Sequence, residues 1–526
     1  MKVTVFHIMY SMSVKLVIWT VKAFLEVIYT PIFLIRLFKK PRKCPLISNK
    51  LLLLPATELA KRIRKKQIPS TEVVKAYISR IEEVNPIINA VLEARFEKAL
   101  EEAKQVDKLL QETDLSEEQL EEKYPLLGVP ITIKGSIAVA GMVHSAGRVD
   151  HNVVAPIDGI PVRHVKGAGA IPLLTSNVPE LCMNWETKNK LIGRTANPYN
   201  SVRTCGGSSG GEASLIGCGA SLLGLGSDIA GSLRLPAHYC GVWGHKPSPH
   251  VVSSEGHYPD CKNKEEWNKV FTIGPMARYV SDLKILLNII AEPEARNLLR
   301  LNETVDVKKI KIYYIYAVAS PLPNHVNTDV VSTIEKVRTH FDILCDSNCT
   351  KVDFPRMRHC IEASYMRLLC LEDVDNIFEG SRGDGAYLEL LRYLVCQSKH
   401  EFTSIGYGLV RRNFHLIPPK IINKVHKYLD DLRNDFLRIL KDNAVMILPT
   451  SPCEATHHGD VFRKMFNPGY LSIFNTLGFP VTNCPVGFNK NGLPIGIQVV
   501  AAPNCDRLTL AVAEELEKAF GGWKFN

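Results

Sequence analysis

Apolar residues recur at helical spacing in the part of the chain that follows its basic amino-terminal segment. Behind Ser70, which can serve as an N-cap, they line one face of a predicted helix (Val73, Val74, Tyr77, Ile78 and Ile81). A second periodic stretch runs from about residue 88 to 110, and Ser116-Glu-Glu-Gln119 has the form of a capping box that opens another short helix. The pattern predicts that residues 50–125 are mainly helical.

Short apolar runs then replace the helical periodicity. Gly128-Val-Pro-Ile-Thr-Ile-Lys134 predicts a strand, and apolar runs alternate with Gly-rich turns and helical stretches up to about residue 250. Near the carboxyl end, residues 445–449 and 480–488 predict buried strands. Asn491-Gly492 predicts a hairpin turn into a strand over 495–500, and an amphipathic helix is expected over 506–520. Strands that alternate with helices without a linker predict one large α/β domain, with a central mixed sheet covered by helices on both faces.

A long apolar run precedes this domain. Residues 16–35 are apolar except for Lys22, Glu26 and two threonines, and twenty residues suffice to cross a bilayer as a helix. No small-residue cleavage site follows, which argues against a signal peptide, and the run ends in a basic flank. A helix lying in the interface is the alternative, because the charged residues share one side. We expect a membrane anchor over residues 1–45 and a folded domain over 46–526.

More basic residues follow the apolar run than precede it, so the positive-inside rule predicts that the folded domain lies in the cytosol. We expect it at an endomembrane or lipid-droplet surface. Two glycosylation sequons, Asn302-Glu-Thr304 and Asn348-Cys-Thr350, would be used only if the domain were luminal.

The net charge of +10 lies mainly in the anchor segment. Residues 1–50 hold nine Lys or Arg against one acidic residue, so the remaining chain is close to neutral. This distribution argues against a nucleic-acid partner, which would require a basic face on the folded domain. The fourteen cysteines show no metal-binding spacing, and in a chain of this size we expect mostly reduced thiols. Adjacent His457 and His458 predict a loop, and we expect neither a metal nor another cofactor.

The densest Gly/Ser region, residues 205–212, is followed by a second one over 226–236. A phosphate-binding loop would need a lysine after these glycines, and a dinucleotide fingerprint would need a third glycine that is missing. Gly206-Gly-Ser-Ser-Gly210 does match the nucleophile elbow of α/β-hydrolases, with Ser208 as nucleophile. That elbow requires a strand before it, whereas residues 197–204 have the composition of a loop.

The two Gly/Ser motifs together resemble those of the amidase signature family. Gly206-Gly-Ser-Ser-Gly-Gly-Glu212 and Gly226-Ser-Asp-Ile-Ala-Gly-Ser-Leu-Arg-Leu-Pro236 are similar to its signature, Gly128–Lys134 is similar to its lysine strand, and Phe479–Val500 to its carboxyl-terminal strand pair. The resemblance extends over about residues 50–525, with the motifs in the same order. With an anchor in front, the chain is most similar to the branch of the family that cleaves fatty acid amides.

The resemblance implies a role for each matching residue. It makes Ser232 the nucleophile, Ser208 a bridging serine whose peptide bond from Gly207 is cis, and Lys134 the general base. It forms the oxyanion hole from the amides of Ile229, Ala230 and Gly231, with that of Ser232, and gives supporting roles to Gly207, Ser209, Asp228 and Arg234. It also places Cys182 and Met183 in the acyl pocket. A lysine can act as a base only when neutral, which burial in an apolar strand favours.

Two residues depart from the family pattern. Ala230 stands where the family usually has Gly, and alanine disfavours a positive φ if the loop requires one. Gly135 follows Lys134 where the family often has an acidic residue. Neither departure removes a reacting group, although a weakly active homologue is one interpretation of them.

The resemblance also implies a lipid substrate. Residues 387–409 mix leucines with Arg392 and Lys399 and resemble a second membrane contact of the family, for which an ordinary core helix is the alternative. We therefore expect a serine hydrolase that cleaves primary fatty amides or N-acylethanolamines through an acyl-enzyme, with the lipid amide and the membrane as partners. A tethered amidase or esterase for smaller amides, a catalytically weak lipid-amide binder and a homodimer are left open.

Overall fold

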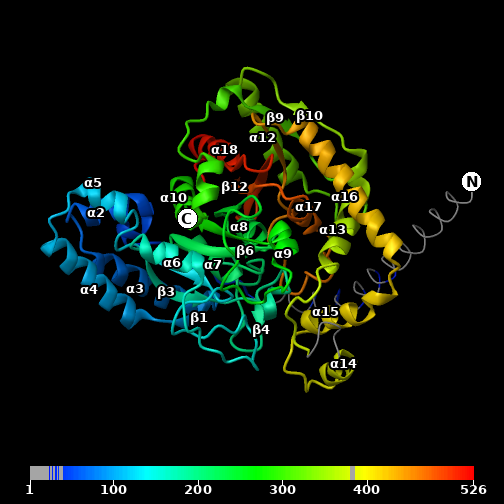
Figure 1. The fold of residues 1–526 in the computed structure, drawn as a ribbon, viewed down its shortest axis with the longest axis horizontal. Coiled ribbons are helices and arrows are strands. Elements are labelled where there is room, and N and C mark those ends of the chain that lie inside the picture. Colours follow the sequence, from blue (N-terminus) through cyan, green and yellow to red (C-terminus); the bar gives the residue numbers. More distant parts are fainter. Residues whose placement is uncertain are drawn as a thin grey trace, which may run out of the picture.

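The computed structural model of the chain describes residues 40–378 and 385–525 and, ahead of them, residues 20, 23, 27, 30, 31 and 34 (Figure 1). Most of the predicted anchor lies outside the described residues, and the predicted division at residue 45 stays a prediction. Within the part that is described, no helix combines the length and the apolar character needed to cross a bilayer.

A mixed sheet runs through the molecule. Within the described ranges it has eleven strands in the order β1-β3-β2-β6-β8-β7-β12-β13-β11-β9-β10. Their bounds are β1 Val91–Ala94, β2 Pro130–Lys134, β3 Ile171–Ser176, β6 Leu223–Asp228, β7 Trp243–Lys246, β8 Thr272–Ala277, β9 Lys311–Tyr314, β10 Thr350–Lys351, β11 Ala444–Pro449, β12 Val481–Phe488 and β13 Pro494–Ala501. Strand β2 pairs parallel with both β3 and β6, whereas β12 and β13 form an antiparallel hairpin.

Helices cover this sheet. Their bounds are α2 Ala56–Arg64, α3 Ser70–Ile88, α4 Phe96–Glu112, α5 Glu117–Lys123, α6 Ile160–Gly167, α7 Gly210–Gly217, α8 Arg234–Tyr239, α9 Lys264–Val270, α10 Val280–Ile290, α11 Pro293–Leu299, α12 Thr328–Leu344, α13 Cys360–Leu369, α14 Ala386–Leu394, α15 Phe402–Asn413, α16 Pro419–Ile439, α17 Gly469–Thr476 and α18 Asp506–Phe520. A separate two-stranded ribbon joins β4 (Lys188–Asn189) to β5 (Gly193–Arg194). Figure 1 shows α2 to α5 at one end of the molecule and α14 beside α15 at another.

Side chains on the carboxyl-terminal hairpin show that both faces of the sheet are covered. Thr482 of β12 donates to Thr509 of α18 at 2.8 Å. Gln498 of β13 pairs with the next residue of β12 and therefore faces the other way. It contacts Arg234 of α8 and the Tyr470 carbonyl of α17. The expected mixed sheet between two helical layers is confirmed.

The structure corrects two predictions in the helical region. Ser70 is the first residue of α3 rather than its N-cap; Asp107 of α4 accepts from its amide at 2.6 Å, and its own hydroxyl donates to the Gly128 carbonyl. The periodic stretch over 88–110 is not one element. Asn89 ends α3 in a left-handed conformation, and β1 pairs with β3 before α4 begins, so sheet pairing overrides the helical pattern.

Other local predictions are confirmed. The capping box at Ser116 is present, the hairpin of β12 and β13 forms, and α18 spans the predicted residues with Gly521 in a left-handed C-cap. All fourteen cysteines are free thiols. The chain around His457 and His458 is a loop, in which His458 Nδ1 lies 2.8 Å from Glu186 Oε1.

Candidate active site

Lys134 is the last residue of β2, which lies between β3 and β6 in the sheet. Its side chain is fully buried, and Nζ lies 2.7 Å from Ser208 Oγ and 2.8 Å from Ser227 Oγ. Burial lowers the pKa of Lys134 below its usual 10.5, because the ammonium loses its hydration, although Cys182 and Asp228 nearby oppose the shift. The amine therefore loses its proton more readily than that of an exposed lysine, as a general base requires.

Ser208 lies in the glycine loop that leads into α7. The Gly207–Ser208 peptide bond is cis, as the family resemblance implies. A Cβ on Gly207 would stand 2.7 Å from the Asn184 carbonyl, so only glycine fits where these two loops meet. Local packing thus accounts for the glycine before this serine.

Ser232 lies in the loop between β6 and α8. Its carbonyl accepts from the Ser209 amide at 2.9 Å, which ties this loop to the one that carries Ser208. Ser208 and Ser232 line the same cavity, although no hydrogen bond joins their hydroxyls in the part of the chain described. The structure brings Lys134, Ser208 and Ser232 together from three separate segments.

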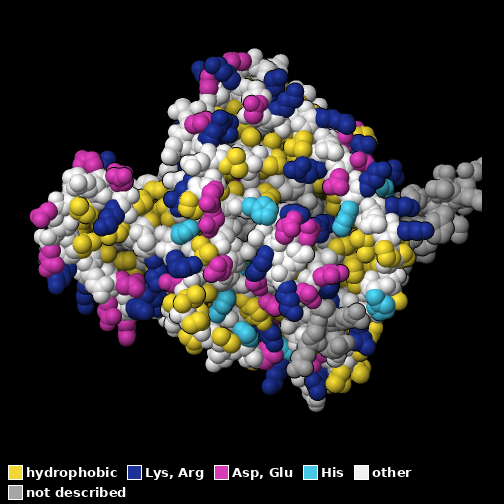
Figure 2. Space-filling model, in the orientation of Figure 1, with side chains coloured by type: hydrophobic (Ala, Val, Ile, Leu, Met, Phe, Trp, Pro, Cys, Tyr) yellow, Lys and Arg dark blue, Asp and Glu magenta, His cyan; other side chains and the backbone are white. Residues whose placement is uncertain are grey.

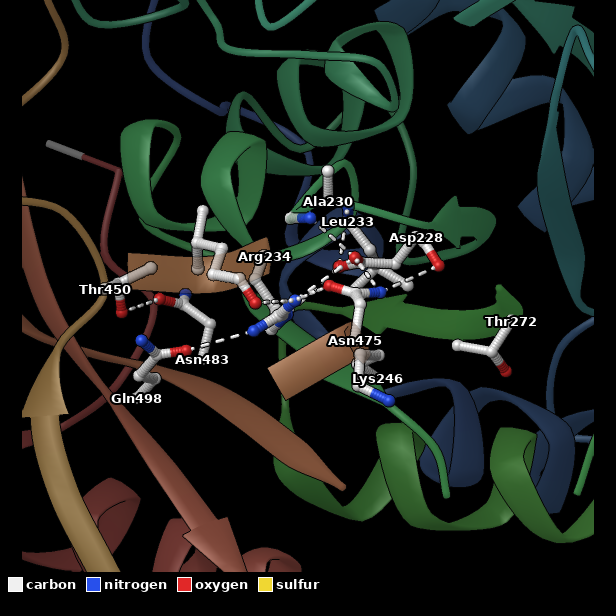
Figure 3. Close-up of polar contacts among 12 residues, drawn as sticks. Asp228, Ala230, Leu233, Arg234, Lys246, Thr272, Thr450, Asn475, Asn483 and Gln498 are labelled. Atoms are coloured by element: carbon white, nitrogen blue, oxygen red, sulfur yellow. Dashed lines mark hydrogen bonds and ion pairs between the residues drawn. The ribbon is translucent and has the colours of Figure 1, made fainter. Parts of the chain in front are cut away.

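A buried polar cluster braces the Ser232 loop (Figure 3). Asp228 accepts from the Gly231 amide at 2.7 Å and from Arg234 Nε at 3.0 Å. Arg234 in turn donates to Asn475 Oδ1 at 2.7 Å and to Gln498 Oε1 at 3.1 Å. Burial alone would raise the pKa of Asp228, but the charge and hydrogen bonds of Arg234 overcome it and lower the pKa to about 2. Asp228 is therefore ionised and holds the loop.

Sequence reasoning missed Asn475 and Gln498. Both are fully buried polar residues in apolar stretches of α17 and β13, and such residues in nearly all cases have hydrogen-bond partners. Their position inside an apolar run was a signal that they contact something polar, but it could not identify Arg234 as the partner.

The Ser232 loop accommodates alanine at position 230. The positive φ of this loop falls on Gly231, at +97°, and Ala230 is not among the residues with positive φ. The concern raised by Ala230 therefore has no basis in the backbone. Gly231 differs from its expected role in the oxyanion hole, because its N–H is bound to Asp228. Within the described residues, no protein acceptor binds the amides of Ile229, Ala230 and Ser232.

Gly135, the other departure, has no space for a side chain. A Cβ there would lie 2.6 Å from the Ser176 carbonyl of β3 and 2.7 Å from Leu92. An acidic residue after Lys134 is therefore excluded by the close approach of β3.

The two serines open onto an apolar cavity of about 310 Å³. Cys182 and Met183 line it as expected, and Leu181 and Cys182 both have left-handed backbone conformations. Its remaining walls come largely from apolar residues of α9, α13 and α15 and the segments beside them (Trp267, Phe271, Tyr365, Leu368, Leu369, Leu371, Val374 and Tyr407).

Sequence reasoning also missed two cavity residues that contact the site. Trp185 donates from Nε1 to the Ala230 carbonyl at 3.0 Å, and its ring stacks on Tyr365. His257 lies 3.0 Å from Ser227 Oγ. Neither residue stands in a motif that would have singled it out.

Comparison with known proteins adds the family context. A sequence model of the amidase family, described as "Amidase", matches residues 72–510. The chain is 41% identical to fatty-acid amide hydrolase 2-B of Danio rerio and 38% identical to fatty-acid amide hydrolase 2 of Homo sapiens. The first alignment covers 92% of this chain and 93% of the relative, and the second covers 92% of each.

A solved structure shares the fold. A structure of fatty acid amide hydrolase superposes with a TM-score of 0.73 at 21% identity, covering 90% of this chain and 86% of the other. The superposition extends over nearly the whole of the described chain, so the mixed sheet and its two helical layers are those of the amidase fold.

Proposed function

This chain belongs to the amidase family, and from that premise we propose that it hydrolyses fatty acid amides, either primary fatty amides or N-acylethanolamines, with Ser232 as nucleophile. The observation that carries the proposal is the buried Lys134 amine, 2.7 Å from Ser208 Oγ beside an apolar cavity that Ser232 lines. No metal or other cofactor enters the proposed reaction.

The proposed reaction moves one proton along the three residues. Lys134 takes a proton from Ser208 as Ser208 takes one from Ser232, and Ser232 Oγ attacks the amide carbonyl. The amides of Ile229, Ala230 and Ser232 donate to the oxyanion that forms. The relay then returns the proton to the leaving amine as the C–N bond breaks, and water hydrolyses the acyl-enzyme by the same route.

The cavity supports a long acyl chain. Its walls are almost wholly apolar, so a hydrocarbon chain would bury surface there at a gain of about 25 cal/mol per Å². Two relatives with 41% and 38% identity are named as fatty-acid amide hydrolases. Both observations favour fatty amides over the smaller amides that were left open.

An exposed apolar surface on α14 supports membrane contact. Tyr387, Leu388, Leu391, Leu394 and Val395 are each more than half exposed, so the core-helix alternative is wrong for α14. Hydrophobic side chains gather over this helix at the lower right of Figure 2. The adjacent α15 lines the cavity through Thr403 and Tyr407, so we propose that a lipid amide passes from the membrane to Ser232 beside these two helices.

Vesicle sedimentation tests this surface. We expect Leu388→Ser, Leu391→Ser and Leu394→Ser combined to weaken binding to phospholipid vesicles, because apolar area inserted into the lipid drives such binding. The control is Ile343→Ser on α12, which is 83% exposed and lies outside the surface. Equal binding of the two variants would contradict the proposed contact.

A fluorophosphonate probe tests the nucleophile. Wild type should react with the probe and release ammonia from a long-chain primary amide faster than from butyramide, whereas Ser232→Ala should do neither. Lys134→Ala should lose turnover, and Ser332→Ala, on α12 away from the cavity, should behave as wild type. Probe labelling that persists in Ser232→Ala would refute the assignment, and faster turnover of butyramide would refute the substrate class.

A further inference from the structure

Lys134 contacts a second hydroxyl that the proposed relay does not use. Ser227, on β6 next to β2, places Oγ 2.8 Å from Nζ. A neutral amine has two N–H groups and one lone pair, and the lone pair must face Ser208 if Lys134 is to take its proton. One N–H must then point at Ser227 Oγ, which has to accept it and to direct its own hydrogen elsewhere.

His257 is the acceptor within reach of that hydrogen. Its Nδ1 lies 2.8 Å from the Pro259 carbonyl oxygen, and since a carbonyl can only accept, Nδ1 carries the hydrogen. Burial, together with the charge of Lys134, lowers the pKa of His257 well below its usual range, so the ring is neutral. Its Nε2 therefore presents one lone pair, 3.0 Å from Ser227 Oγ and 3.0 Å from Ser136 Oγ.

We propose that His257 is a positioning residue for the base: by accepting the Ser227 hydroxyl hydrogen at Nε2, it turns Ser227 toward Lys134 as an acceptor and so holds the Lys134 lone pair on Ser208. The inference rests on the proposed role of Lys134 as the base. It extends the three-residue relay by a group that orients the base without touching the substrate carbonyl.

The same arrangement stabilises Lys134 after it has taken the proton. The ammonium then donates to Ser227, whose own hydrogen is held by the imidazole, so the hydrogen bonds polarise one another. Without His257, the Ser227 hydroxyl is free to donate to the Lys134 lone pair and competes with Ser208. Loss of the imidazole should therefore slow the reaction and make Lys134 easier to deprotonate.

Other ionisable groups act on Lys134 and His257, and the variants compared in a test must all retain these groups. Cys182, Asp228 and Glu212 act on Lys134, and His144 and Lys264 act on His257. Burial raises the pKa of Glu212 to about 7, so its own titration can contribute to a pH profile. Variants compared at positions 227 and 257 retain all five groups, so a difference between their profiles reports on Lys134.

The first experiment measures kcat, KM and the pH dependence of kcat/KM for His257→Leu and His257→Gln. We expect His257→Leu to lower kcat about ten- to a hundred-fold, the range for a lost buried hydrogen bond, with little change in KM. The acidic limb of its kcat/KM profile should move to lower pH. His257→Gln keeps an acceptor near Nε2 and should recover much of the rate and the position of the limb.

A double-mutant cycle shows whether His257 acts through Ser227. Ser227→Ala should lose a similar factor, and the double variant Ser227→Ala/His257→Leu should lose no more than the worse single variant. Ser136→Ala, on the other hydroxyl that reaches Nε2, should keep wild-type kcat, because the proposal gives the lone pair to Ser227. Thermal unfolding of each variant separates loss of folding from loss of rate.

Several results would overturn the inference. These are full kcat with an unmoved acidic limb in His257→Leu, multiplicative losses in the double variant, or a loss in Ser136→Ala that matches that of His257→Leu. If His257→Leu does not fold, the test passes to the two serine variants. Wild-type kcat in Ser227→Ala then overturns the inference. A loss of kcat of about ten- to a hundred-fold in Ser227→Ala, with wild-type kcat in Ser136→Ala, supports it. Failure of the proposed function differs from all of these, because wild type itself would then show no probe labelling or turnover.

Discussion

Trp185→Phe tests how the Ser232 loop is held. The indole Nε1 donates to the Ala230 carbonyl at 3.0 Å, and the Gly231 N–H of the same peptide donates to Asp228 at 2.7 Å. This peptide is therefore fixed at both ends, one residue before the proposed nucleophile. Phenylalanine keeps a ring that can stack on Tyr365, whose centroid is 5.8 Å away, and removes only the donor.

The expected magnitude follows from the surroundings of the carbonyl. A buried acceptor left without a partner costs about 1–3 kcal/mol. Ala230 lines the cavity, so we expect water to replace the indole at its carbonyl, which favours the lower figure of about 1 kcal/mol. That value corresponds to a roughly five-fold lower kcat, well below the 10²–10³ lost with an oxyanion donor, because Asp228 still holds Gly231.

Steady-state kinetics on a long-chain primary amide provides the assay. We expect kcat to fall and KM to stay nearly constant, with a parallel fall in the rate of fluorophosphonate labelling. Tyr365→Phe is the matched control, because it removes a hydrogen bond to the Met465 carbonyl from the other ring of the stack without touching the loop. A rise in KM at constant kcat would refute the reasoning, since Trp185 would then act only as a wall of the cavity.

Three further predictions concern Gly135 and Ala230, which depart from the family pattern, and the proposed base Lys134. Gly135→Ala should lower the free energy of unfolding by about 1–3 kcal/mol, because its Cβ would meet the β3 backbone, whereas Gly167→Ala, with open space around it, should not; denaturant unfolding compares the two, and equal stability would contradict the clash. Ala230→Gly should leave turnover unchanged and cost about 0.5–1 kcal/mol of stability, since φ is not positive there, and a gain in turnover would show that alanine does impair the loop. Lys134→Met should abolish turnover. Its stability relative to wild type should also fall as pH rises toward 10.5. The pKa of Lys134 is lower in the folded state than in the unfolded state, so between these two pKa values unfolded wild type binds one more proton and wild type gains stability as pH rises. Thermal unfolding at several pH values measures this difference, and a constant difference would be inconsistent with a depressed pKa.

The elements that sequence predicted well are those fixed by neighbouring residues. The capping box at Ser116 and helix α18 depend on residues a few positions apart, and both lie where the pattern placed them. Ser70 shows the limit of such reasoning. Its amide is capped by Asp107, thirty-seven positions away, so the local N-cap rule selected the wrong residue.

The candidate site likewise contains residues that sequence motifs identify and residues that only the fold identifies. Motif spacing selected Lys134, Ser208 and Ser232, and the fold places the two serines on one cavity with the Lys134 amine in contact with Ser208. It could not select Asn475, because that residue is recognised only by its contacts with Asp228 and Arg234, more than two hundred positions earlier. His257 likewise acquires meaning only from the Ser227 hydroxyl beside it.

The contacts of Arg234 with Asn475 and Gln498 also bear on how the protein is made. During synthesis, Ser232 emerges from the ribosome more than two hundred residues before Asn475 and Gln498, whose contacts with Arg234 brace its loop. Contacts between distant parts of a chain form late, because the loop between them must close first. Until α17 and β13 dock, Asp228 can hold the Ser232 loop, but Arg234 lacks Asn475 and Gln498, and a product that ends before residue 475 never acquires these two partners. The full set of contacts around Arg234 therefore requires the carboxyl-terminal part of the chain.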